Sequence, residues 1–167
     1  MTSSLDFSPI EDWIAAARFA VRRDDDATVI YTNPGGEVRI YIREVDGVYD
    51  VSEAERSGDE RFKFSTRELD LLLKFLTLEL GGAVRFNAGL PLQSVPSLLE
   101  DLPSGFEIET PNPDVDVLLE SGVPVASLES GSGLYPAVEF ALVARASLSQ
   151  IKESFLAADG APLLLRS

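Results

Sequence analysis

The sequence predicts an α+β fold: an antiparallel meander sheet of about five or more strands, with helices packed on one face. Three observations predict it. Short runs with apolar residues at alternate positions, separated by turn signals, fill residues 19–64. A leucine-rich segment with helical spacing follows at residues 69–80, and an amphipathic segment lies at residues 147–159. With 167 residues, 45% of them hydrophobic, the chain has the size and composition of one globular domain, which we expect to span residues 1–167.

The N-terminal part predicts a helix and then a hairpin. Ser8 supplies a capping hydroxyl and Pro9 a proline at the first helical position, so a helix is expected to open there and run to about Arg18. Its buried side is expected to carry Trp13, Ile14 and Ala17. Residues 19–31 then have the pattern of two short strands joined by a turn around residues 23–26.

A second hairpin is predicted over residues 32–51. Apolar and polar side chains alternate before Asp46-Gly47, a pair that supplies the positive φ angles of a two-residue type I′ turn. The turn fixes a register with two diagnostic pairs: Ile42 with Val51 on the core side, and Arg43 with Asp50 in water. A further strand is expected to end at Phe64, after a loop centred on residues 57–59.

The core helix is predicted next. Residues 65–68 have the capping-box signature, leucines follow at helical spacing to Leu80, and Gly81-Gly82 is expected to end the helix. Beyond it, frequent prolines favour short elements: helices at residues 95–102 and 112–121, and strands at residues 106–109 and 123–128. The last part predicts a strand at residues 137–145, a helix at residues 147–159 ending at Gly160, and a return to the sheet at residues 162–165.

The composition argues against most catalytic chemistry. The chain has no cysteine and no histidine, which removes thiol nucleophiles, thiolate metal sites, the commonest general base and the usual ligand of zinc or haem. We therefore expect no enzyme activity, no metal and no cofactor. No run approaches the ~18 to 20 apolar residues of a membrane helix, and the N-terminus lacks the pattern of a signal peptide, so a cytoplasmic protein is expected.

The charge distribution is uneven. The net charge of −14 would repel nucleic acid and anionic membranes and favours a basic partner. Residues 86–144 contain no lysine or arginine but nine acids: Glu100, Asp101, Glu107, Glu109, Asp114, Asp116, Glu120, Glu129 and Glu139. This base-free acidic segment has two interpretations, a solvated surface that promotes solubility or a docking face for a basic partner. Asp114 and Asp116 are expected in a first helical turn, where they favour the helix dipole.

Two other motifs have simple structural explanations. The run Asp24-Asp25-Asp26 lacks the spaced ligands and glycine of a calcium loop, so it predicts a solvated hairpin tip. Neither residues 33–36 nor Gly81-Gly82 match a phosphate-binding loop, so a turn and a helix end are sufficient explanations.

The order of these features resembles a known family. The early Trp13, the meander at residues 29–64, the helix "LDLLLKFLTLELGG", the segment "VRFNAGLPL" and the ending "SLSQIKESFLAADGAPLLL" are similar to actinobacterial immunity proteins. These are the immunity proteins paired with the tuberculosis necrotizing toxin and related polymorphic toxins. The likeness covers about the first half of the chain and its last twenty residues.

The resemblance implies an immunity protein, or antitoxin, without catalytic residues that binds one toxin domain, one to one, and occludes its active cleft. For toxins of the necrotizing type, the blocked activity would be NAD glycohydrolysis. Two candidate contact surfaces follow: the loop Ser57-Gly58-Asp59-Glu60, which projects between strands, and the acids Glu100, Asp101, Glu107 and Glu109. Two other classes stay open: a secretion chaperone or adaptor for a basic partner, and a hydrolase that uses a pair of carboxylates.

Overall fold

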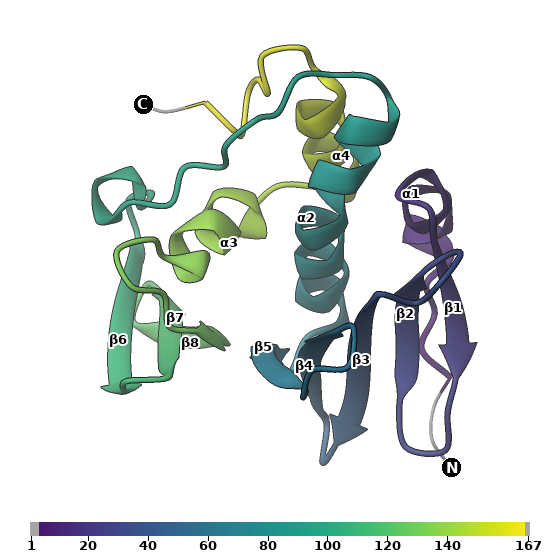
Figure 1. The fold of residues 1–167 in the computed structure, drawn as a ribbon. Helices are drawn as coiled ribbons and strands as arrows, with labels where there is room; N and C mark the ends of the chain where they lie inside the picture. The colour runs from purple at the N-terminus through teal and green to yellow at the C-terminus, as the bar shows by residue number, and fades with distance from the viewer. Residues whose placement is uncertain (1–3, 166–167) are drawn as a thin grey trace.

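The computed structural model describes residues 4–165, which form a layer of strands and a layer of helices (Figure 1). The strands are β1 (Phe19–Arg23), β2 (Thr28–Thr32), β3 (Val38–Val45), β4 (Val48–Glu55), β5 (Arg61–Thr66), β6 (Phe106–Asn112), β7 (Val115–Glu120) and β8 (Val123–Glu129). The helices are α1 (Glu11–Ala16), α2 (Leu69–Asn87), α3 (Pro136–Ala144) and α4 (Leu148–Leu156), with single 3-10 turns at Ser8–Ile10 and Leu99–Asp101.

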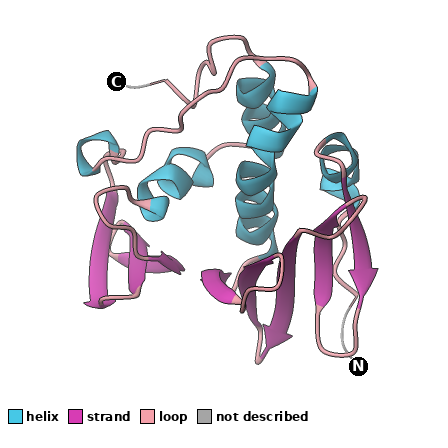
Figure 2. Cartoon of the chain, in the orientation of Figure 1, coloured by secondary structure: helices cyan, strands magenta, loops and turns pink. Residues whose placement is uncertain are grey.

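All strands in the described residues belong to one antiparallel sheet, ordered β1-β2-β3-β4-β5-β8-β7-β6. The chain makes a meander from β1 to β5, leaves the sheet for α2, and returns to add a second meander beside β5 (Figure 2). The α-helices lie on one side of this sheet (Figure 1). The predicted α+β class, with an antiparallel meander and helices on one face, is therefore confirmed.

The core lies between these two layers. The sheet contributes Ile30, Ile40, Ile42, Val51 and Phe64, each at most 4% exposed. Rings from three elements meet at its centre, where Phe64 stacks on Phe75 of α2 at 4.2 Å and contacts Phe140 of α3 edge-on at 4.9 Å. This aromatic cluster joins helices and strands that are distant in sequence.

The first helix confirms the predicted buried side but not the predicted cap. Trp13, Ile14 and Ala17 are buried, and the indole of Trp13 donates a hydrogen bond to the Thr77 carbonyl at 3.0 Å. The Ser8 hydroxyl does not cap the helix; instead the Ser8 amide donates to Asp6 and residues 8–10 form a 3-10 turn before α1.

The Asp46-Gly47 hairpin has the predicted register. Val45 pairs with Val48, Ile42 with Val51 and Arg43 with Asp50, and both Ile42 and Val51 are buried. Arg43 faces Asp50 as predicted, but its guanidinium forms its ion pairs with Glu60 at 2.7 Å and with Asp26 at 3.2 Å. By extending across the neighbouring strands, the Arg43 side chain reaches two carboxylates, those of Asp26 and Glu60, instead of the one of Asp50.

Gly47→Val is expected to destabilise the fold by about 1 kcal/mol or more. Gly47 has a φ of +75°, a conformation that a β-branched residue adopts only under strain. The free energy of unfolding from urea titration measures the loss. Ser57→Val is the control: it introduces the same side chain at an exposed loop position and should change stability by less than about 0.5 kcal/mol. An equal effect at both positions would contradict the turn argument.

The core helix is longer than predicted. It does not end at Gly81-Gly82 but continues to Asn87, and its N-cap Glu68 makes no side-chain capping hydrogen bond. Gly81 is used for close packing: a Cβ there would lie 2.4 Å from the Phe155 ring of α4. Gly81, the first residue of a pair that resembles a helix end, is therefore where α2 and α4 touch.

Several predictions in the second half are wrong. Residues 137–145 form helix α3 rather than a strand, because a segment that is apolar on all sides also fits a fully buried helix. Residues 112–121 form the β6–β7 turn and strand β7 rather than a helix, and the strand buries Asp116, whose Oδ1 accepts from the Thr110 hydroxyl at 2.6 Å. Residues 95–102 contain only the 3-10 turn, and residues 162–165 stay outside the sheet. Strands β6 and β8 and helix α4 confirm the remaining elements.

Candidate functional site

The first candidate surface is the loop between β4 and β5. Ser57, Gly58 and Asp59 are exposed, and the side chains of Ser57 and Asp59 make no hydrogen bond within the described residues. The loop is nevertheless shaped by its backbone: Arg56 has a φ of +50°, and the Gly58 amide donates to the Glu55 carbonyl at 2.8 Å. The tip therefore presents an unpaired carboxylate on an ordered turn.

Glu60, the fourth predicted residue of this loop, has a different role. Its two carboxylate oxygens accept from the Arg43 guanidinium at 2.7 and 3.2 Å, and one of them also accepts from the Ser52 hydroxyl at 2.5 Å. The Arg43 guanidinium, followed by the Ser52 hydroxyl, holds the pKa of Glu60 below its ordinary value. Glu60 thus anchors the loop to the sheet and is not free to meet a partner as Asp59 is.

The second candidate surface is split by the fold. Glu107 and Glu109 are exposed on β6, which is one of the two edge strands of the described sheet. Glu100 and Asp101 lie in the 3-10 turn before it, where the Asp101 carboxylate accepts from the Leu98 amide at 3.1 Å. Strands β8 and β7 separate β6 from β5, so this acidic edge and the 57–60 loop do not form one patch.

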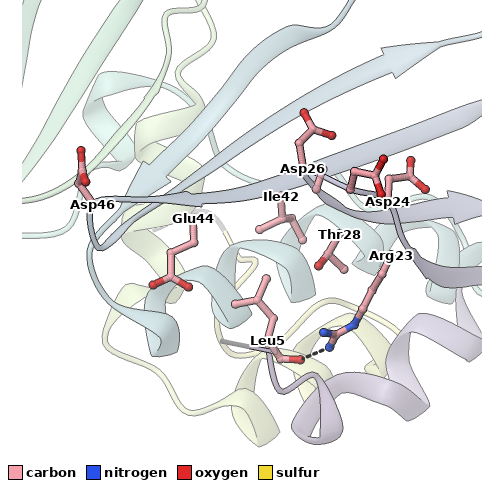
Figure 3. Close-up of a pocket in the computed structure, with 10 residues that line it drawn as sticks. Leu5, Arg23, Asp24, Asp26, Thr28, Ile42, Glu44 and Asp46 are labelled. Atoms are coloured by element: carbon pink, nitrogen blue, oxygen red, sulfur yellow. Dashed lines mark hydrogen bonds between the residues drawn. The ribbon is translucent and has the colours of Figure 1, made fainter. Parts of the chain in front are cut away.

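The structure also shows an acidic pocket that the sequence analysis did not predict. A cavity of about 270 Å³ lies where the β1–β2 and β3–β4 turns meet at one end of the sheet (Figure 3). Five carboxylates line it, above apolar atoms of Leu5, Ala27 and Ile42: Asp24, Asp25, Asp26, Glu44 and Asp46. The predicted solvated hairpin tip is exposed, but hairpin register also brings it beside a second turn, which composition alone cannot show.

Arg23 supplies a cation at this pocket. Its guanidinium donates to the Leu5 carbonyl at 3.4 Å (Figure 3). It also donates to the Ser4 hydroxyl at 2.5 Å. Two of the five carboxylates already have partners nearby, since Asp24 pairs with Arg22 and Asp26 with Arg43. Across residues 4–165, no group of three or more acids converges closely enough to hold a metal ion.

A second group of acids lies between the layers. Glu79 of α2 and Glu139 of α3 are half-buried near Glu53 and Glu129, around Lys63 and Arg61 of β5. Lys63 pairs with Glu129 at 2.6 Å, and Arg61 with Glu129 at 3.3 Å and with Glu53 at 3.7 Å. Burial, followed by the charge of Glu79, raises the pKa of Glu139 to about 7; burial also raises the pKa of Glu79.

These two acids are the nearest match to the carboxylate pair that a hydrolase would require. Neither Glu79 nor Glu139 lines the acidic pocket of Figure 3 or the groove of about 350 Å³ beside Trp13 and Leu156. A catalytic pair has to reach a substrate, whereas these carboxyls face Lys63 between packed helices and strands. The arrangement accounts for a pH-dependent stability more directly than for catalysis.

Glu139→Gln is expected to stabilise the protein by about 2 kcal/mol at pH 8, after allowance for partial exposure of the side chain. The folded pKa of about 7 lies above the ordinary 4.5, so stability is greatest below pH 4.5 and falls as the pH rises to 7. Glutamine mimics the protonated carboxyl, so the gain should shrink as the pH falls from 8 to 5. Urea unfolding at both pH values measures it, with the exposed Glu107→Gln as a control that should show no such trend. A gain that grows towards pH 5 would contradict the assignment.

Among residues 4–165, the structure has no helix whose length and apolar character would let it cross a bilayer.

Comparison with known proteins identifies the family. The model of the family described as Immunity protein 61 matches residues 13–163. The "Immunity factor for TNT" of Mycobacterium tuberculosis is 29% identical over 170 residues, which cover 98% of this chain and 95% of that protein. Its homologue in Mycobacterium bovis has the same identity and coverage. The solved structure of Rv3902c from M. tuberculosis superposes with a TM-score of 0.87 at 27% identity, over 99% of this chain and 98% of that one. The chain therefore belongs to the Immunity protein 61 family.

Proposed function

We propose that this immunity protein binds a cognate toxin domain of the necrotizing type and occludes its active cleft, so that NAD cannot enter. The observation that carries the proposal is similarity along nearly the whole chain to proteins named immunity factors for TNT. The proposal is of a cytoplasmic, single-domain inhibitor spanning residues 1–167, which acts one to one, has no activity of its own, and has neither nucleic acid nor membrane as partner.

The 57–60 loop is the part proposed to enter the cleft. A narrow site is blocked best by a projection, and Asp59 would bring a carboxylate to a cleft that binds a negatively charged dinucleotide. The ion pair between Glu60 and Arg43 supports this role, because a loop held in shape loses less conformational entropy on binding. The acids Glu100, Asp101, Glu107 and Glu109 would contribute a field that speeds association with a basic partner.

Co-expression tests the proposal. The toxin domain encoded beside this chain, and separately the necrotizing toxin domain, should kill cells when expressed alone and spare them when expressed with this protein. Absence of protection in both pairings would refute the immunity assignment to this class of toxin. Cells that survive without a complex detectable by size-exclusion chromatography would refute occlusion.

Asp59→Arg is expected to raise the dissociation constant for the toxin domain that this protein neutralises by roughly a hundredfold, because it reverses the charge at the tip of the loop proposed to enter the cleft. Glu153→Arg makes the same change of charge on the exposed side of α4 and should alter the dissociation constant by less than about threefold. Surface plasmon resonance with immobilised toxin domain measures both. Equal effects of the two variants would show that charge alone matters and that the loop does not enter the cleft.

A further inference from the structure

One face of the sheet is not covered by the helix layer. Ile30, Ile40 and Ile42 point into the core, so the residues that alternate with them on β1–β3 point to the opposite side. That side carries Arg22, Tyr31, Arg39, Tyr41 and Arg43, which we call the Arg–Tyr face. The helices lie on the other side of the sheet (Figure 2).

The Arg–Tyr face is ordered without a partner. Arg22 lies over the Tyr31 ring at 5.2 Å and pairs with Asp24, and Arg43 lies over the Tyr41 ring at 5.4 Å. The Arg39 Nε donates to the Tyr41 hydroxyl at 3.1 Å. Beneath these side chains, Val29 is fully buried between its strand neighbours Arg22 and Tyr41. Side chains already held in this way have little rotamer freedom left to lose on binding.

The same side chains hold the 57–60 loop. Arg39 donates to the carbonyl of Gly36 at 2.8 Å and to that of Arg56, at the start of the loop, at 2.7 Å. Arg43 binds the carboxylate of Glu60, at the end of the loop. Both ends of the loop are therefore fixed to strand β3 of the Arg–Tyr face, and the two form one continuous surface.

Charge narrows the choice of partner. Nine of the 14 lysine and arginine residues lie in residues 18–67, together with 11 of the 28 acids, so this part is close to neutral, whereas residues 86–144 hold nine acids and no base. Nucleic acid and a second copy of the chain are both disfavoured by the net charge of −14. Tyrosine and arginine are the residue types that contribute most to protein–protein interfaces, and their flat faces and forked donors fit carboxylate and apolar groups on a protein surface.

We propose that the Arg–Tyr face docks on the rim of the toxin cleft that the 57–60 loop enters, against a protein surface with carboxylate and apolar groups. This inference rests on the proposed function. The 57–60 loop occludes the cleft, and the Arg–Tyr face contributes most of the buried interface area that holds the loop there. Loss of contacts on the face should therefore act mainly on the rate of dissociation.

The test uses the toxin domain that this protein neutralises in co-expression. Tyr31→Ala and Arg22→Met should each weaken binding at least tenfold, chiefly through faster dissociation. Two matched variants on the helix side are the controls: Tyr135→Ala, which removes a half-buried tyrosine beside α3, and Arg145→Met, which removes an arginine that stacks on Phe106 and pairs with Glu120. The controls should bind within about threefold of the wild-type protein.

A measurement on the wild-type chain avoids any effect of the variants on folding. Oxidative footprinting read by mass spectrometry should show Tyr31 and Tyr41 protected in the complex, and Tyr135 as reactive as in the free protein. Neutralisation with unchanged footprints and with affinity unchanged in Tyr31→Ala would overturn this inference and leave the proposed function intact. A free chain that is dimeric, and becomes monomeric in Tyr31→Ala, would assign the face to self-association and also overturn it. Failure to neutralise any toxin domain would instead refute the proposed function.

Discussion

Replacing Arg85 with methionine is expected to lower the free energy of unfolding by about 4 kcal/mol. Arg85 of α2 is only 2% exposed and forms no ion pair within the described residues. Its guanidinium donates instead to backbone carbonyls: those of Pro91 at 2.6 Å, Phe155 at 2.8 Å and Ala158 at 2.6 Å, and that of Ala157. Methionine fills similar space but leaves these buried carbonyls without donors.

Urea unfolding followed by circular dichroism measures this effect. Arg67→Met is the control, because Arg67 is exposed and, within residues 4–165, its side chain makes a single hydrogen bond, of 3.5 Å, to the Asp46 carbonyl. Loss of the Arg67 side chain should therefore change stability by less than about 0.5 kcal/mol. A loss below about 1 kcal/mol for Arg85→Met would show that water replaces the guanidinium and that the site is not sealed.

Replacing Gly81 with leucine is expected to lower the free energy of unfolding by about 3 kcal/mol or more, whereas Gly82→Leu should raise it by up to about 1 kcal/mol. Both glycines are in α2, and both gain the same helix propensity from leucine. They differ in surroundings: a Cβ at Gly81 would meet the buried Phe155 ring at 2.4 Å, whereas a Cβ at Gly82 meets nothing within 4 Å. The adjacent pair thus separates helix packing from helix propensity.

Thermal unfolding of the two variants beside the wild-type protein gives the comparison. If both leucine variants were equally stable, α2 and α4 could move apart at no cost in stability. The close contact at Gly81 would then not contribute to the stability of the fold.

Local patterns predict the first half of the fold well, because its strands follow one another and each register depends on a nearby turn. The type I′ turn at Asp46-Gly47 fixes the pairing of Ile42 with Val51 without any distant contact. The same reasoning fails for α3, since an apolar segment of nine residues fits either a buried strand or a buried helix. Only its packing against Phe64 and Phe75 decides between them.

In the candidate site too, local sequence predicts some features, whereas others depend on contacts between distant residues. The exposure of Ser57, Gly58 and Asp59 follows from the turn composition between two predicted strands, and the structure places them so. The anchoring of Glu60 by Arg43 was missed, because the two residues are 17 positions apart and meet across strands. The acidic pocket and the Glu79–Glu139 pair likewise depend on how turns and helices pack, and no spacing along the chain encodes them.

Occlusion of the cleft is tested most directly by titrating the toxin domain's NAD hydrolysis with this protein, with the mass of the mixture measured by light scattering. If this protein occludes the cleft, activity falls linearly to zero at one equivalent and the mixture then contains a one-to-one complex. Asp59→Arg should turn the sharp endpoint into a shallow curve, while Glu153→Arg should keep it. Full NAD hydrolysis in the presence of a stable one-to-one complex would contradict occlusion of the cleft.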